Sequence, residues 1–303
     1  MKTKIIAIQS DGYKLLLQGF TAWLKLLNYS SLSIPSIQAG LKHFLYYQEQ
    51  KGKTTLAVLT ANDGNAFINY LQENTGNGNS TINKNIQALK LFSKYIRATG
   101  KSQIGFAIAL KKVAKTNPIW LTEAEITKIY AAIPNSILGI RDAAMLALYY
   151  GCGLRLNEGK NIQLQDIDYT QKLVHVKKGK GYKERFVPIA AKSFEAITLY
   201  IEKGRPQLTQ ENNANNYLFI GANTGKPMDK QSLYIRLKLL IKKANLKQKI
   251  GTHTLRHSIA THLLQSGMKL EKIQQFLGHS HLDSTQIYTH IVNENGSNNL
   301  YQT

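Results

Sequence analysis

The sequence predicts a mainly helical protein with a small β-sheet, an α+β fold built as two domains. The chain has 303 residues, which is long enough for two hydrophobic cores. Its first hundred residues hold four runs with the apolar spacing of amphipathic helices. Strand-like residues flank a turn within residues 173–189. We therefore expect an N-terminal helical domain over residues 1–104, a linker over 105–117 and a mixed domain over 118–303.

Four helix-like segments make up the first domain, and Ser/Pro, Gly/Lys and Asn/Gly turns separate them. They cover residues 13–27, 36–50, 63–73 and 81–100. The last segment is rich in basic side chains, which makes it a candidate for lying along a groove of DNA. A solvated helix face is the ordinary explanation of such charges. The candidate DNA-binding residues of this segment are Lys84, Lys90, Lys94 and Arg97.

The second domain opens at residues 119–133, where Thr122 followed by Glu125 predicts a capping box at the start of a helix. A helix that contains Arg155 follows, and then a short sheet between Leu173 and Ile189. Two more helices are expected over residues 191–202 and 230–244. Further helices at the C-terminal end carry the motifs described below.

The chain is strongly basic, with 39 Lys and Arg against 18 Asp and Glu, a net charge of +21 and a pI near 9.8. Residues 1–100 hold 11 basic and 4 acidic side chains, so the excess is spread over both domains. Such a charge predicts a polyanionic partner. RNA or an acidic protein would fit the charge as well as DNA, so charge alone gives the class of partner and not its identity.

Cys152 is the only cysteine, which excludes an intramolecular disulfide and fits a reducing cytoplasm. It lies in an apolar run beside Arg155, where we expect a small buried hydrophobe rather than a reactive thiol. The sequence shows no signal peptide and no apolar stretch of about 18 residues or more. We therefore expect a cytoplasmic protein with no membrane partner.

The segment from His253 to Tyr288 is the most informative part of the chain. Within HTLRH, His253 and Arg256 lie three residues apart and would share one face at the start of a helix, where both could point at one anion. A second amphipathic run, KLEKIQQFLGH, ends at His279, and Tyr288 follows after a turn-prone segment. Four groups suited to a phosphodiester thus come from three successive segments.

Two upstream motifs extend this pattern. GCGLRLNEG offers Arg155 and Glu158, and the hairpin-like KLVHVKKGKGYKERFVPI holds Lys180 in its turn. Together with HTLRH, LGH and YTH, these motifs resemble the tyrosine recombinase (phage-integrase) family, in its Xer-like or mobile-element form, over roughly residues 10–292. The resemblance implies a helical, SAM-like core-binding domain followed by a tyrosine-recombinase catalytic domain. It implies six catalytic residues: Arg155, Lys180, His253, Arg256, His279 and Tyr288.

The resemblance implies DNA recombination or integration, and the residue types fit that chemistry. A tyrosine has a reference pKa near 10, so at neutral pH only about one phenol in a thousand is ionised, a deficit of about 4 kcal/mol. Cations near Tyr288 must supply much of the free energy needed to ionise its phenol. Arg155 and Arg256 stay charged and present forked donors that match two non-bridging phosphate oxygens. They could clamp the phosphate and stabilise the charge that builds up in the transition state.

The remaining candidates supply proton transfer. His253 could take the phenol proton, because the reference pKa of histidine lies near working pH. Lys180 could protonate the departing 5′-oxygen, and His279 could donate to the phosphate. Tyr288 as the nucleophile gives a 3′-phosphotyrosyl link and a free 5′-hydroxyl, in a reversible transesterification. Bond energy is conserved, so we expect neither a cofactor nor a metal ion.

The resemblance also implies partners. Family members act on double-stranded DNA as tetramers that join two DNA sites, and some use accessory DNA-bending proteins or a partner recombinase. The polar tail after Tyr288 is by analogy the element expected to dock on a neighbouring protomer. In the hairpin, Lys177, Lys178 and Lys183 are candidate DNA-binding residues that surround Lys180. Which of these lysines is the general acid stays open at this point.

Other readings remain. His253 and His257 could form a zinc pair, but HTLRH lacks the internal glutamate of a metalloprotease helix and no third ligand is obvious. A type IB topoisomerase would use similar residues to relax DNA. A metal-dependent transposase would need clustered carboxylates, whereas the acids here are scattered. A non-catalytic DNA-binding regulator with a relic site is the alternative of a different class, and the complete set of six argues against it.

Overall fold

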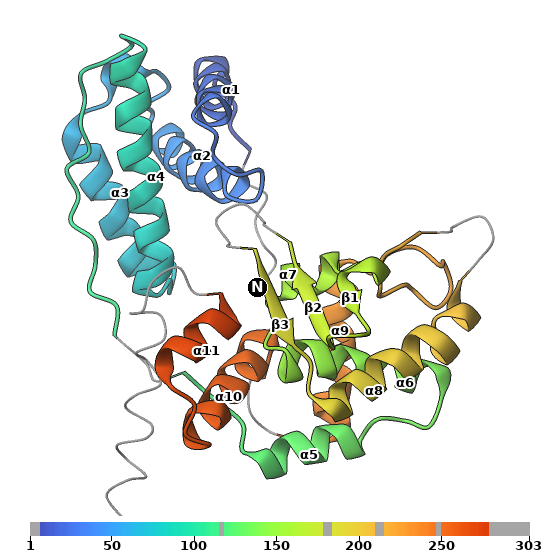
Figure 1. The fold of residues 1–303 in the computed structure, drawn as a ribbon. Coiled ribbons are helices and arrows are strands. Elements are labelled where there is room, and N and C mark those ends of the chain that lie inside the picture. Colours follow the sequence, from blue (N-terminus) through green and yellow to red (C-terminus); the bar gives the residue numbers. More distant parts are fainter. Residues whose placement is uncertain (1–6, 115–117, 178–183, 210–214, 247–249, 279–303) are drawn as a thin grey trace, which may run out of the picture. The chain divides into compact units, whose positions relative to one another are not determined.

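The computed structural model describes residues 7–114, 118–177, 184–209, 215–246 and 250–278. The chain divides into two compact units, Met1–Lys115 and Thr116–Thr303. Helices dominate both units, and the second also holds a three-stranded sheet (Figure 1). The predicted fold class, mainly α with a small sheet, is confirmed. Within the ranges just given, no helix combines the length and the apolar character that a membrane span requires.

Among its described residues the first unit holds four α-helices, each of which falls where the sequence predicts one. Local capping marks the start of the first and third helices: the Ser10 side chain accepts the backbone N–H of Tyr13, and Asp63 accepts that of Thr60 at 2.7 Å. A 3-10 turn precedes the third helix. The helices are α1 (Asp11–Leu26), α2 (Ile34–Gln50), α3 (Ala61–Asn74) and α4 (Asn79–Ala98).

An aromatic core holds these helices together. Phe20, Phe44 and Phe92 are fully buried within it. Phe106 packs against Phe44 and Phe92, with ring centroids 5.2 Å and 6.4 Å away, and Ile108 is buried beside it. Both of these residues lie in the stretch that the sequence predicts to be a linker. The first part of that stretch is therefore packed onto the helices of the first unit.

The second unit begins with a helix whose capping box is confirmed: the Thr122 hydroxyl accepts the N–H of Glu125, and the Glu125 carboxylate accepts the N–H of Thr122. Two π-helical turns, Ala147–Gly151 and Tyr200–Gly204, extend two of its helices. The α-helices are α5 (Glu123–Ala131), α6 (Ile137–Leu146), α7 (Leu156–Asn161), α8 (Ala191–Leu199), α9 (Lys230–Lys243), α10 (Thr252–Gln265) and α11 (Leu270–Leu277).

The sheet is antiparallel in the order β1 (Ile167–Asp168), β2 (Leu173–Val176) and β3 (Arg185–Pro188). The second and third strands are the two flanks of the predicted hairpin, with Val174 opposite Val187 and Val176 opposite Arg185. Alternate residues of a strand face opposite sides. Val187 and Arg185 are both buried, so an arginine occupies a core-facing position of β3. Figure 1 shows α11 lying beside β3 and α10.

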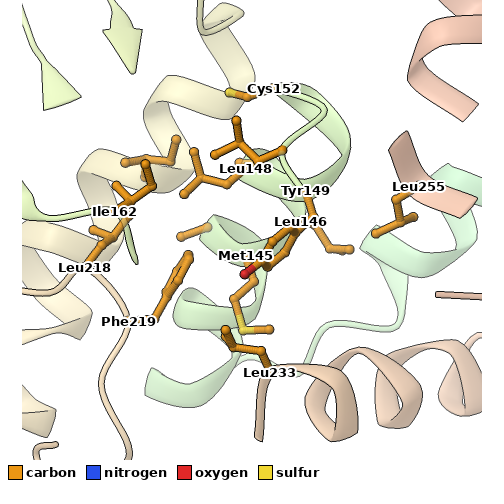
Figure 2. Close-up of a cluster of buried hydrophobic side chains, with 14 of the residues drawn as sticks. Met145, Leu146, Leu148, Tyr149, Cys152, Ile162, Leu218, Phe219, Leu233 and Leu255 are labelled. Atoms are coloured by element: carbon orange, nitrogen blue, oxygen red, sulfur yellow. The ribbon is translucent and has the colours of Figure 1, made fainter. Parts of the chain in front are cut away.

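The core of the second unit gathers around the end of α6 and the π-helical turn that follows it (Figure 2). Cys152 is fully buried there, and burial raises the pKa of its thiol to about 12. The expectation of a buried, unreactive cysteine is confirmed. The side chains labelled in this core are Met145, Leu146, Leu148, Tyr149, Cys152, Ile162, Leu218, Phe219, Leu233 and Leu255.

Candidate active site

Arg155 lies at the N-cap of α7, one residue before the helix that we expected to contain it. Gly153 just ahead of it has a φ of 60°, a left-handed conformation that glycine adopts without strain and that lets the chain turn into α7. The backbone N–H of Arg155 donates to Glu158 Oε2 at 2.9 Å, and its Nη1 donates to Glu158 Oε1 at 2.8 Å. One carboxylate therefore fixes both the main chain and the side chain of Arg155.

Glu158 is buried in the first turn of α7 and is the meeting point of three arginines. Arg185 donates from Nη1 to Oε1 at 3.2 Å and from Nη2 to Oε2 at 2.9 Å. Arg256 Nη1 lies 3.8 Å from Oε2. Burial alone would raise the pKa of Glu158, but the hydrogen bonds and charge of Arg185, followed by the hydrogen bonds from Arg155, lower it to about 2. The carboxylate is therefore ionised at neutral pH.

Arg256 projects from the second turn of α10 and is 3% exposed. A buried guanidinium is costly unless its donors are satisfied. Nη1 donates to the Gly153 carbonyl at 2.7 Å, and Nη2 donates to the Leu277 carbonyl at 2.6 Å. Arg256 thus connects the turn ahead of Arg155 with the end of α11.

The C-terminal end of α11 is capped by the same three arginines. The last carbonyls of a helix have no partner within it and carry partial negative charge. Arg185 Nε donates to the Phe276 carbonyl at 3.0 Å, and Arg155 Nη2 contacts the Gly278 carbonyl at 3.4 Å. With the bond from Arg256, three successive carbonyls each receive a guanidinium. The φ of 66° at Gly278 ends the helix in the left-handed region.

His253 is the second residue of α10 and is exposed, whereas Arg256, one turn further along, is buried. Although the residue as a whole is exposed, loss of hydration around its ring lowers its pKa. The positive charges of Arg256 and then Arg155 lower the pKa further. The ring is therefore neutral at pH 7 and can accept a proton.

The other three residues of the predicted set, Lys180, His279 and Tyr288, lie outside the described residues, as do Lys178 and Lys183. In sequence, His279 directly follows the helix end that the arginines cap. The structure thus brings Arg155 and Arg256 together at Glu158, and both lie close enough to His253 for their charges to lower its pKa. The roles of all six residues stay predictions.

Arg185 is the residue of this cluster that the sequence reasoning missed. The sequence predicts a strand flank at KERFVPI and no separate role for Arg185. One signal was available. Strand alternation places Arg185 on the same face as Val187, so a charge pointing towards the core should have called for a buried carboxylate partner. Glu158 is that partner.

Three of the candidate DNA-binding residues line one groove. Lys84, Lys90 and Lys94 are exposed along α4. Arg97, farther along α4, donates from Nε to the Gln103 carbonyl at 3.3 Å. The groove has a volume of about 680 Å³ and is lined by Tyr29, Leu32, Ser33, Ser36, Ile37, Lys84, Gln87, Lys90, Leu91 and Lys94.

Lys177, another candidate for DNA contact, pairs with the protein itself. Its Nζ lies 2.7 Å from Oδ1 of the buried Asp166. The lysine side chain is 51% exposed, so it can also meet an outside group.

The histidines considered as a zinc pair both lie on α10. Burial lowers the pKa of His257 to about 4, and the charges of His253 and Arg256 add to the shift. In the part of the chain that the structure describes, His, Cys, Asp and Glu side chains form no group of three suited to a metal ion.

The chain matches known recombinases along most of its length. The model of the phage integrase family matches residues 119–295. The tyrosine recombinase XerC of Oceanobacillus iheyensis is 31% identical over 272 residues, which cover 88% of each chain. The tyrosine recombinase XerD of Listeria monocytogenes is 30% identical over 266 residues, 86% of this chain and 89% of the relative.

Solved structures share the fold. The XerH site-specific recombinase bound to its difH substrate superposes with a TM-score of 0.75 at 21% identity, covering 97% of this chain and 98% of the other. The integrase of transposon Tn1549 in complex with transposon right end DNA superposes with a TM-score of 0.70 at 18% identity, covering 93% of this chain and 99% of the other.

These matches confirm the resemblance seen in the motifs. The chain belongs to the phage integrase family, the tyrosine recombinases. Within that family it is a tyrosine-type site-specific recombinase, the class of its XerC and XerD relatives.

Proposed function

We propose that the protein cuts and rejoins double-stranded DNA by transesterification through a 3′-phosphotyrosyl intermediate, in integration, excision or resolution. The observation that supports this most is the convergence of Arg155 and Arg256, from distant parts of the sequence, on Glu158 and on adjacent carbonyls at the end of α11. Two neighbouring guanidiniums suit the two non-bridging oxygens of a phosphodiester. They would stabilise the charge that develops as the phosphorus becomes pentacoordinate.

In the proposed step, Tyr288 Oη attacks the phosphorus, and the bond from phosphorus to the 5′-oxygen breaks. His253 accepts the phenol proton, which its lowered pKa permits because the ring is neutral before the step. Lys180 gives a proton to the departing 5′-oxygen, and His279 donates to the phosphate. The products are a 3′-phosphotyrosyl link and a 5′-hydroxyl. Attack by a 5′-hydroxyl on that link reverses the step and joins the new strand.

Double-stranded DNA is the proposed partner, as it is for the XerH recombinase and the Tn1549 integrase in their DNA complexes. We assign residues 1–104 to a core-binding domain, in which Lys84, Lys90 and Lys94 meet the phosphate backbone, and residues 118–303 to the catalytic domain. We further propose a tetramer on two DNA sites, with accessory DNA-bending proteins or a partner recombinase as additional components.

A plasmid assay tests this function. Two copies of the DNA that flanks the gene, in direct repeat on a supercoiled plasmid, should be resolved into two smaller circles. A matched plasmid with scrambled copies should stay intact. Relaxation of both plasmids without exchanged products would identify a type IB topoisomerase activity instead. Binding to the flanking DNA with no strand cleavage would identify a regulator, and either result would contradict the proposal.

A further inference from the structure

Arg185 occupies an unusual place for a charged side chain. It is the first residue of β3, it faces the core, and it is 9% exposed. In sequence it follows the hairpin turn that contains Lys180. Its guanidinium contacts Glu158 in α7, the helix that Arg155 precedes. It also contacts the Phe276 carbonyl in α11, the helix that His279 follows in sequence.

Every nitrogen of this guanidinium is engaged. Nη1 and Nη2 meet the two oxygens of Glu158, the forked geometry that only an arginine provides. Nε donates to the Phe276 carbonyl. The backbone of Gly278 lies against the same group: a Cβ added there would come within 2.8 Å of Arg185 Nη1. Arg185 therefore fixes both the carboxylate and the end of α11.

The Glu158 carboxylate decides how Arg155 is held, because Oε1 is shared by Arg155 Nη1 and Arg185 Nη1. It also lies 3.8 Å from Arg256. Without Arg185, the ionised and buried Glu158 would keep Arg155 and Arg256 as its cationic partners among the described residues. It would draw both guanidiniums towards itself and compete with a phosphate for them.

We propose that Arg185 is a positioning residue of the recombination site: by saturating Glu158 and holding the Phe276 carbonyl, it keeps Arg155 and Arg256 available to the scissile phosphate. The inference rests on the proposed function. Arg185 does not touch the reacting atoms. Its loss should therefore slow cleavage far more than it weakens binding to the DNA site, because small displacements of phosphate-binding groups cost about 100-fold in rate.

The test uses the full chain and a duplex selected from randomised DNA by binding to that chain. A nick beside the scissile phosphate lets the short 5′-hydroxyl fragment leave, so covalent product accumulates in a single turnover. We expect Arg185→Gln to lower the cleavage rate about 100-fold while the dissociation constant for the duplex changes by less than about threefold. The variant Arg185→Lys keeps the positive charge but loses the forked pair of donors. Its cleavage rate should lie between those of Arg185→Gln and the native protein.

A double variant separates positioning from simple loss of packing. In Glu158→Gln/Arg185→Gln the unpaired carboxylate is gone, so Arg155 and Arg256 are no longer drawn away from the phosphate. We expect it to cleave about tenfold faster than Arg185→Gln. A purely structural role predicts the opposite, because the second substitution removes further contacts from the same cluster.

Arg205→Gln is the matched control, because Arg205 is equally buried in the second unit and donates to the Tyr217 carbonyl. It should cleave within about threefold of the native rate per folded molecule. Four results would overturn the inference: native-like cleavage by folded Arg185→Gln, equal losses in Arg185→Gln and Arg205→Gln, no gain in the double variant, or, where Arg185→Gln does not fold, native-like cleavage by Arg185→Lys. Absence of covalent product with the native chain would instead refute the proposed function, and the inference with it.

Discussion

Arg155 and Glu158 are joined twice, through the backbone N–H of the arginine at 2.9 Å and through its Nη1 at 2.8 Å. Three residues apart at the start of a short helix, they form a local unit that the GLRLNEG motif encodes directly. The lowered pKa of the Glu158 carboxylate records how strongly its ionised form is held. Stability against acid should therefore report on this site.

Glu158 should make the second unit acid-sensitive. Its folded pKa of about 2 lies below the reference value of 4.5, so its contribution to stability is present above pH 4.5 and is lost as the pH falls towards 2. The difference corresponds to about 3 kcal/mol. Urea unfolding, followed by Trp120 fluorescence in a Trp23→Phe background, should show that the free energy of unfolding falls with pH over this range. In Glu158→Gln this fall should be smaller. An unchanged pH dependence in Glu158→Gln, with exposed Glu73→Gln as the control, would contradict the assignment.

In the proposed step His253 accepts the phenol proton, so cleavage should fail in acid, where the ring becomes protonated. Its pKa is lowered from 6.5, so the rate should be constant above that value and fall only at lower pH, as the ring becomes protonated. The measurement is the single-turnover cleavage rate from about pH 5 to pH 8. In His253→Gln the acid limb should disappear along with most of the rate. An acid limb centred above pH 6.5 would show that another group governs the step.

Lys180 should be dispensable when the leaving group needs no proton. A substrate with sulfur in the 5′-bridging position releases a thiolate, which is a far weaker base than an alkoxide. We expect Lys180→Ala to cleave ordinary DNA about 100-fold more slowly or worse and to recover on the sulfur substrate. Lys183→Ala is the control and should show neither effect. Rescue of Lys183→Ala in place of Lys180→Ala would move the general acid to Lys183.

The lysines of the α4 groove should appear in the salt dependence of binding. Each phosphate contact contributes about −0.9 to the slope of log K against log salt. Replacing Lys84, Lys90 and Lys94 by glutamine should therefore make the slope shallower by about 2.7. The double variant Lys25→Gln/Lys51→Gln, which alters two exposed lysines outside the groove, serves as the control. Equal slopes for the native chain and the triple variant would mean that the groove does not meet DNA.

Local signals predicted the fold well. The helix over residues 119–133 was marked by Thr122 and Glu125, whose mutual hydrogen bonds are present in the structure. Cys152 was placed in the core from the apolar residues around it, and it is fully buried. Such features depend on neighbours in sequence, which a single chain displays. The sequence predicts Arg155 inside a helix, whereas it lies at the N-cap of α7, because helix caps are less distinct in sequence than apolar periodicity.

The candidate site was harder to predict because its contacts join distant segments. Arg185 and Glu158 are 27 residues apart, and the sequence around each residue does not indicate that the other is its partner. Lys177 was expected to meet DNA, and its pairing with buried Asp166 depends on how the 3-10 turn before β1 packs against β2. Sequence motifs identified Arg155 and Arg256 separately. Their meeting at one carboxylate emerges only from the packing of α7, α10 and α11.

The central claim is that Tyr288 forms the covalent link to DNA in a reaction that requires no metal ion. The direct measurement is to incubate the native chain with the nicked duplex in excess EDTA, digest the covalent product with a protease and locate the nucleotide-bearing peptide by mass spectrometry. The account predicts one modified residue, Tyr288, joined through its side-chain oxygen to the 3′-phosphate of the cleaved DNA strand. It predicts no covalent product from Tyr288→Phe. A modified residue other than Tyr288, or a complete loss of product under chelation, would contradict it.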